Sequence, residues 1–108
     1  QLEQLQDLKL EVIVRAKSIE VSDQVGGKLA DLPNVDDAHD LKGLSEYLQR
    51  VKARFPDKTQ ATILLQSDTS YDTLVQVMDT LRLVTLSRPA GNVNAELFPD
   101  ISIGDAPI

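Results

Sequence analysis

Two helical patterns separated by one short apolar strand restrict the folds that this chain can adopt. Apolar residues recur at three- and four-residue steps from Leu41 to Phe55 and again from Leu74 to Val84, which is the spacing of one buried helix face. Between them, Ala61–Ser67 contains a continuous aliphatic run, which favours a central strand buried on both faces. The sequence therefore predicts helices packed in a layer against a sheet.

The residues before the first helix alternate in polarity with the period of a strand. The apolar face changes parity at Lys17-Ser18, and this change predicts a hairpin formed by Lys9–Ala16 and Ile19–Ser22. Gly26-Gly27 predicts a second turn, and it leads to a short apolar segment, Lys28–Leu32, that we take as a third strand.

Local signals also predict where the helices begin and end. Asp37 is placed to cap the first helix, and Pro56 ends it. The tetrapeptide Thr69–Asp72 matches a capping box, and the second helix is expected to continue to about Ser87. Pro89–Asn94 is then expected to be a loop.

The last extended segment, Ala95–Ile103, is expected to be either an edge strand or a strand broken in two, because Pro99 cannot donate a hydrogen bond to a neighbouring strand. Leu97, Ile101 and Ile103 share one parity and are the candidate residues of this edge. An edge strand has free backbone groups that can pair with a second copy or with a foreign strand. A loop or the end of the chain covering this edge is the alternative, and the sequence leaves both open.

These elements predict an α+β fold, a two-layer sandwich of two amphipathic helices on one mixed sheet, in the order β-β-(β)-α-β-α-β. Residues 10–108 are expected to form one domain, preceded by a linker at residues 1–9. The 108 residues are enough for one modest hydrophobic core.

Net charge and composition narrow the classes of partner. The chain has 17 acidic and 11 basic residues, a net charge of −6, so phosphate-rich DNA, RNA and anionic lipid would be repelled. The absence of cysteine excludes disulfides and a thiolate nucleophile. No apolar run approaches the roughly 20 residues that a membrane helix needs.

The single histidine is a weak candidate for metal binding. His39 lies between Asp36 and Asp40, and these three side chains could in principle hold a cation. An acid-rich first turn with an exposed histidine explains the same residues, and we favour that interpretation. We expect no enzyme activity, no cofactor and no resident metal.

Asp68 and Tyr71 lie at a strand-to-helix junction, where α/β proteins often bind ligands. A carboxylate and a phenol could bind a small polar ligand there. The local alternative, which we favour, is that Asp68 accepts hydrogen bonds from the start of the helix while Tyr71 packs in its first turn.

Four basic residues gather around the end of the first helix: Arg50, Lys52, Arg54 and Lys58. They could bind a carboxylate-rich partner. Compensation of the helix dipole is the simpler account, because cations are favoured at the carboxyl end of a helix.

The segment from Leu41 to Leu83 resembles the ExbD/TolR family. The resemblance rests on a proline-bearing loop, a strand ending in aspartate, a tyrosine three residues later and a helix with a Val-x-x-Val-Met-Asp-like pattern. These are Phe55-Pro56-Asp57, Ala61 to Asp68, Tyr71, and Leu74-Val75-Gln76-Val77-Met78-Asp79.

The resemblance implies a role in energy transduction. Members of this family have one membrane helix and a periplasmic domain, and with an ExbB/TolQ-like subunit they form a proton-driven motor that energises TonB- or Tol-dependent transport. By this resemblance the chain is the periplasmic domain of a single-pass inner-membrane protein, it dimerises, and it binds peptidoglycan or a TonB-like protein. Residues 1–9 would be the linker from an upstream membrane helix that carries the proton-binding aspartate.

The chain departs from the family after the second helix. The family usually has a glycine and a short final strand there, whereas residues 84–94 are longer and include Pro89 and Gly91. Which transport system is served therefore stays open. A small regulatory ligand-binding domain is the alternative function.

Overall fold

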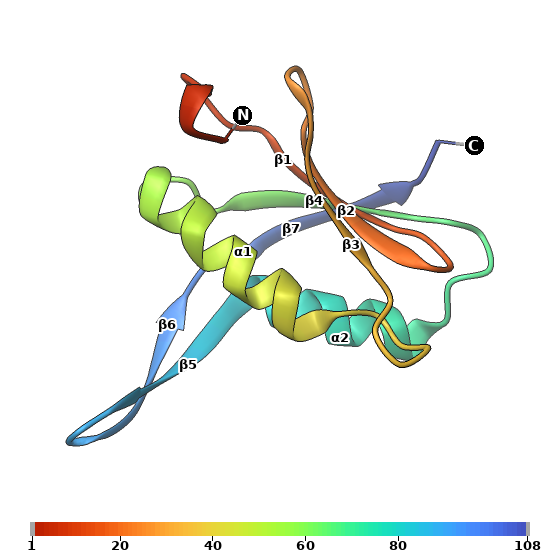
Figure 1. The fold of residues 1–108 in the computed structure, drawn as a ribbon. Coiled ribbons are helices and arrows are strands. Elements are labelled where there is room, and N and C mark those ends of the chain that lie inside the picture. The colour runs from red at the N-terminus through yellow and green to blue at the C-terminus, as the bar shows by residue number, and fades with distance from the viewer. Residues whose placement is uncertain (1, 108) are drawn as a thin grey trace.

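A five-stranded sheet, two helices and a separate hairpin make up the computed structural model, which describes residues 2–107 (Figure 1). The elements are η1 (Leu2–Gln4), β1 (Leu10–Val14), β2 (Ser18–Asp23), β3 (Gly27–Pro33), α1 (Leu41–Arg54), β4 (Gln60–Leu65), α2 (Tyr71–Arg82), β5 (Leu83–Arg88), β6 (Gly91–Glu96) and β7 (Asp100–Asp105).

The main sheet has the order β3-β2-β1-β4-β7 and is mixed. β1, β2 and β3 are antiparallel neighbours, as the two predicted turns require, whereas β4 runs parallel to β1 and β7 runs parallel to β4. Both helices lie on one face of this sheet (Figure 1). The predicted α+β class, with two helices on a mixed sheet, is confirmed, and β4 is an interior strand. The predicted burial of β4 on both faces is wrong, because the helices cover one face only (Figure 1) and Thr62 and Leu64 on the other are half-buried.

The core forms where alternate strand residues meet the two helices. Val12 has Val21 as its partner on one side and Ile63 on the other, and all three side chains are completely buried. Leu44 and Leu48 of α1 belong to the same buried cluster. These contacts explain the observed spacings, because a strand buries every second residue and a helix every third or fourth.

The first helix begins later than predicted. Asp40, not Asp37, is the N-cap, and its Oδ1 accepts a hydrogen bond from the Gly43 backbone N–H at 2.9 Å. Asp36 and Asp37 instead form a tight turn with φ of 52° and 63°. Aspartate is one of the few residues that tolerates this left-handed conformation. The first two aspartates of the acidic run therefore form a turn, and the third, Asp40, caps the helix.

The second helix ends five residues earlier than predicted. α2 stops at Arg82, and residues 83–96 form the β5–β6 hairpin where the sequence indicated a helix end followed by a loop. The carbonyl oxygens of Leu81 and Arg82 accept hydrogen bonds from the backbone N–H groups of Phe98 and Leu97, both at 2.8 Å. The returning chain thus binds carbonyls that a longer helix would have used.

The N-terminal segment packs on the domain. Leu2 and Leu8 are each 5% exposed and belong to the hydrophobic core. Within residues 2–107, neither helix is long and apolar enough to cross a membrane.

Candidate interaction site

The outer edge of β7 presents a regular row of backbone groups. The Asp100 N–H donates to the Thr59 carbonyl at 3.0 Å and the Ala106 N–H donates to the Leu65 carbonyl at 2.8 Å, so even-numbered residues face β4. Because successive residues of a strand turn their backbone groups to opposite sides, Ile101, Ile103 and Asp105 direct theirs to the open edge. In the described part of the chain no further strand pairs there.

The opposite edge of the sheet is less suited to pairing. β3 has a bulge where its register with β2 shifts, and Lys28 and Asp31 carry charge along it. The Asn34 N–H donates to the Lys17 carbonyl, which places Pro33 at a position whose backbone groups face outward, and proline has no N–H to offer. Bulges, charges and prolines are common means of protecting an edge strand, and β7 contains none of these between its two terminal aspartates.

Pro99 divides the predicted segment, which is one of the two sequence expectations: Ala95 and Glu96 end β6, and β7 begins at Asp100, immediately after Pro99. Residues 100–105 then form one continuous strand at the edge of the sheet, as the other expectation had it. At its start the Thr59 hydroxyl donates to Asp100 Oδ2 at 2.7 Å.

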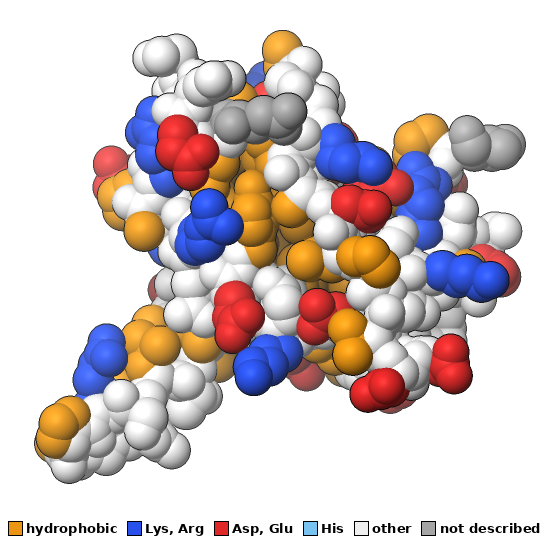
Figure 2. Space-filling model, in the orientation of Figure 1, with side chains coloured by type: hydrophobic (Ala, Val, Ile, Leu, Met, Phe, Trp, Pro, Cys, Tyr) orange, Lys and Arg blue, Asp and Glu red, His pale blue; other side chains and the backbone are white. Residues whose placement is uncertain are grey.

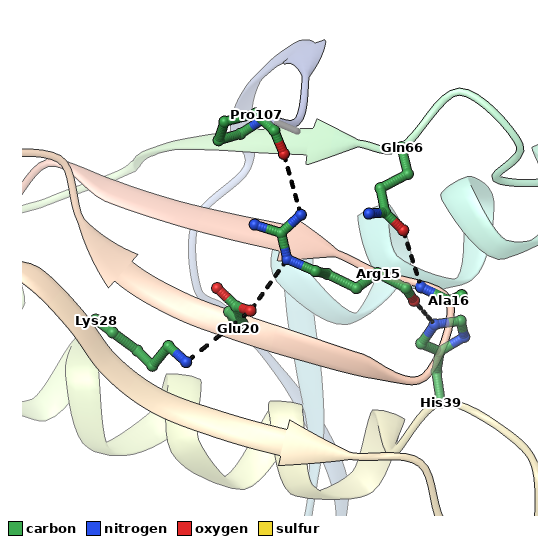
Figure 3. Close-up of polar contacts among 7 residues, drawn as sticks. All are labelled: Arg15, Ala16, Glu20, Lys28, His39, Gln66 and Pro107. Carbon is green, nitrogen blue, oxygen red and sulfur yellow. Dashed lines mark hydrogen bonds and ion pairs between the residues drawn. The ribbon is translucent and has the colours of Figure 1, made fainter.

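The carboxyl end of β7 is fixed by contacts with the β1–β2 turn (Figure 3). Arg15 Nη1 donates to the Pro107 carbonyl at 3.2 Å, while Arg15 Nε lies 3.0 Å from Glu20 Oε2. In the same region the Ala16 N–H donates to Gln66 Oε1 at 3.1 Å. β7 is therefore held at both ends and offers a preformed edge.

The three candidate apolar residues lie in different environments. Ile101 is half-buried and packs against the core, and Ile103 is 52% exposed. Leu97 is only 3% exposed and lies outside β7, in the segment that crosses from β6. The prediction that Leu97 contributes to the edge is wrong, because its backbone binds Arg82 and its side chain joins the core.

Asp68 and Tyr71 do not form a pocket. Both are exposed, and Tyr71 is 79% exposed. The N-cap of α2 is Ser70, whose hydroxyl accepts from the Thr73 N–H at 3.1 Å, one residue later than the capping-box prediction. Within residues 2–107 the Asp68 side chain makes no hydrogen bond or ion pair, so its predicted capping role is also wrong.

The acidic residues around His39 do not assemble a metal site. His39 Nε2 lies 2.6 Å from the Arg15 carbonyl oxygen (Figure 3), and Asp40 is engaged as a cap. No cluster of three potential metal ligands occurs among residues 2–107.

The basic residues near the end of α1 contact the N-terminal segment, which the sequence did not indicate. Lys58 Nζ lies 2.6 Å from Asp7 Oδ1, and this hydrogen bond holds the pKa of Asp7 below its ordinary value. Arg54 donates to the Leu5 carbonyl at 2.7 Å, and Arg50 lies 3.7 Å from Glu3.

A polar hollow of about 540 Å³ opens at the amino-terminal ends of β1 and β4. Acidic and basic side chains both line it, among them Asp7, Lys9, Glu11 and Lys58. Sequence periodicity could not reveal this hollow, because it lies between segments about 50 residues apart along the chain.

Comparisons of this chain with protein families, with curated proteins and with solved structures found no match.

Proposed function

We propose that this chain is a protein-interaction domain that pairs the open edge of β7 with the same edge of a second copy. The observation that supports this most directly is the contrast between the two edges of the sheet. β3 is bulged, charged and ends in a proline, whereas β7 is regular, held at both ends and apolar at its centre.

Backbone direction limits the register of such a dimer. Residues whose N–H and C=O groups face outward must lie opposite each other in an antiparallel pair. A two-fold axis at Ser102 satisfies this condition and places Ile101 of each copy opposite Ile103 of the other. Each such pair exchanges two backbone hydrogen bonds, and the four isoleucines lie together on the helix-bearing face.

The energy-transduction role is the wider part of the proposal. The ExbD/TolR-like motif coincides with β4, the start of α2 and its buried face, where Val77 and Leu81 are completely buried. We place the domain in the periplasm, as part of a single-pass inner-membrane subunit that works with an ExbB/TolQ-like protein. The dimer would then bind a TonB-like protein or peptidoglycan.

Two proline substitutions test the pairing edge. Ile103→Pro removes an outward-facing N–H from β7, and with it half of the backbone hydrogen bonds across the two-fold axis. Asp31→Pro is the matched control, because it removes an outward-facing N–H from β3 and leaves β7 intact. Sedimentation velocity over a concentration series should show a dimer for the parent and for Asp31→Pro, and a weakened dimer for Ile103→Pro. A monomeric parent, or equal weakening by both substitutions, would refute pairing through β7.

The wider role is tested separately. The chain should co-sediment with purified peptidoglycan sacculi or be retained by an immobilised TonB-like C-terminal domain, and the intact gene should encode an apolar helix of about 20 residues with one acidic residue upstream of this domain. An intact gene that lacks such a helix would refute the ExbD/TolR-like assignment and leave the pairing edge as a separate result.

The polar hollow supports the alternative of a small ligand-binding domain. Its mixed charges suit a small zwitterion, whose carboxylate and ammonium groups would replace the present ion pair between Lys58 and Asp7. A screen of amino acids by thermal unfolding tests this alternative, since a ligand that binds only the folded state raises Tm. A rise in Tm that is lost in Lys58→Ala would favour it.

A further inference from the structure

The β5–β6 hairpin extends from the body of the molecule as an arm (Figures 1 and 2). Its two strands pair with each other over residues 83–96 and with no strand of the main sheet. At the tip, Gly91 has φ of 124°, a conformation that favours glycine and closes the turn after Arg88. A two-stranded hairpin alone is only marginally stable in water, so this arm needs a surface to pack against.

The two faces of the arm differ in polarity. The cross-strand pairs Val84–Ala95 and Leu86–Val93 make one face apolar. At the base of the arm Val84 packs against the core of its own copy, whereas toward the tip Val93 is 51% exposed. The opposite face carries the pairs Thr85–Asn94 and Ser87–Asn92, and the Thr85 hydroxyl donates to Asn94 Oδ1 at 2.9 Å. This alternation is typical of a sheet that is covered on one side only.

The area that a dimer requires is larger than β7 can supply. A six-residue strand about 20 Å long, with side chains about 10 Å deep, buries on the order of 400 Å² for the pair. A stable interface usually buries roughly 1,200 Å² or more. Each arm face, about 20 Å by 10 Å, corresponds to on the order of 400 Å² when both contacting surfaces are counted. Its base at Val84 already packs on the core of its own copy, so two arms supply much of the missing ~800 Å² and not all of it.

The topology indicates where the arm would lie. In an antiparallel β7 pair, the amino-terminal end of one strand lies beside the carboxyl-terminal end of the other. The arm joins β7 at its amino-terminal end, and the parallel strand β4 turns into α2 at the opposite end of the sheet. Each arm therefore starts beside the β4–α2 turn of the second copy.

Charge and exposure at that turn fit the arm. Tyr71 is 79% exposed, and Asp68 has no partner within residues 2–107. The arm carries one acid, Glu96, and one base, Arg88, which also has no partner among the described residues. Two copies that each carry a net charge of −6 repel each other, and an arm without net charge adds nothing to this repulsion. The positive charge of Arg88 is complementary to Asp68 in the β4–α2 turn.

We infer that the β5–β6 arm packs its apolar face on the β4–α2 turn of a second copy, so that two copies exchange arms. The inference rests on the proposed pairing of β7. The arm and this turn lie at opposite ends of one molecule, whose longest dimension is 45 Å (Figure 1). A covalent bond between them must therefore join two copies.

Disulfide trapping tests the contact directly, and the absence of native cysteine makes it specific. Val93→Cys and Tyr71→Cys are prepared separately, mixed and oxidised under mild conditions. The mixture should give a disulfide-linked dimer that contains one copy of each variant. The matched control pairs Val93→Cys with Val25→Cys, because Val25 is 84% exposed but lies at the β2–β3 turn. Equal linkage in the control mixture, or none in either, would overturn the inference.

Shortening the arm separates this inference from the proposed function. Leu83 and Glu96 are direct partners, so residues 84–95 can be replaced by Asn-Gly without changing the register at the base of the arm. The dimer dissociation constant should rise tenfold or more. A dimer of unchanged affinity would overturn arm exchange while leaving β7 pairing intact, whereas a monomeric parent would overturn both.

A vesicle-binding assay covers the other possible use of the arm. If the parent binds anionic lipid vesicles, and shortening the arm abolishes this binding without changing the dimer, the arm binds a membrane surface and arm exchange is overturned.

Discussion

The Asp23 carboxylate should be a large single polar contribution to stability. Its side chain is 6% exposed at the end of β2. Oδ1 accepts from the Lys9 N–H at 2.7 Å, and Oδ2 accepts from the Val25 and Gly26 N–H groups at 3.2 and 2.6 Å. In Asp23→Asn only one side-chain oxygen remains, and the new amide group faces at least one backbone donor.

The expected loss follows from those contacts. A hydrogen bond to a charged group contributes about 1.5–3 kcal/mol, and a donor left unsatisfied costs a similar amount. We expect Asp23→Asn to lower the free energy of unfolding by about 2–3 kcal/mol at neutral pH. For a domain of this size that corresponds to a fall in Tm of roughly 10–20 °C.

The effect should depend on pH in a defined direction. Burial by itself would raise the pKa of the Asp23 carboxyl, but the three N–H donors outweigh it and hold the pKa below its ordinary value of 3.8. A lowered pKa in the folded state means that this stabilisation is complete above pH 3.8 and is lost as the pH falls through the folded value. The difference between parent and Asp23→Asn should therefore shrink at low pH.

Urea unfolding at pH 7 and at about pH 2.5 measures both quantities. Asp31→Asn is the matched control, since Asp31 is exposed on β3, and it should change stability by less than about 0.5 kcal/mol. A loss below about 0.5 kcal/mol for Asp23→Asn at pH 7, or a difference that is the same at both pH values, would refute the reasoning.

Three further substitutions test the helix ends and the core, each by urea unfolding. Ser70→Ala should cost about 1 kcal/mol through loss of the α2 cap, whereas Asp68→Ala should be nearly neutral, and the reverse order would contradict the observed cap. Gly43→Ala should destabilise by about 1 kcal/mol, although alanine usually favours a helix, because its Cβ would overlap the Asp40 carboxylate; a gain in stability would show that the cap can move. Phe98→Ala should cost about 3–5 kcal/mol because the ring is completely buried, and a loss below about 1.5 kcal/mol would mean that the site collapses around the cavity.

Local pattern was sufficient for most of the elements. The helical spacing from Leu41 to Phe55 and the two turns near Lys17 and Gly26 correspond to α1 and to the β1–β2–β3 meander. These patterns depend only on residues that are close together in the sequence, so they can be recognised without knowing how the rest of the chain folds. The interior position of β4 was predicted correctly from its aliphatic run, but the burial on both faces that the run also indicated is wrong. Both helices lie on one face of the sheet (Figure 1), so Ala61 and Ile63 are buried whereas the alternate residues Thr62 and Leu64 are only half-buried.

The candidate site was only partly predictable. An edge strand with Ile101 and Ile103 was expected, and both lie on β7. Leu97 and Asp68 were assigned wrongly. Leu97 is covered by the core, and Ser70 caps α2 in place of Asp68. Both outcomes depend on how segments distant in the sequence pack together.

Sequence by itself determined the α+β class, the two amphipathic helices and the strand meander, because hydrophobic period and turn chemistry are properties of neighbouring residues. Only the tertiary structure decided that α2 stops at Arg82 and that the chain then forms an arm. The physical reason is that the carbonyl oxygens of Leu81 and Arg82 accept hydrogen bonds from the backbone N–H groups of Phe98 and Leu97. Contacts between residues some 16 positions apart produce no periodic pattern in the sequence.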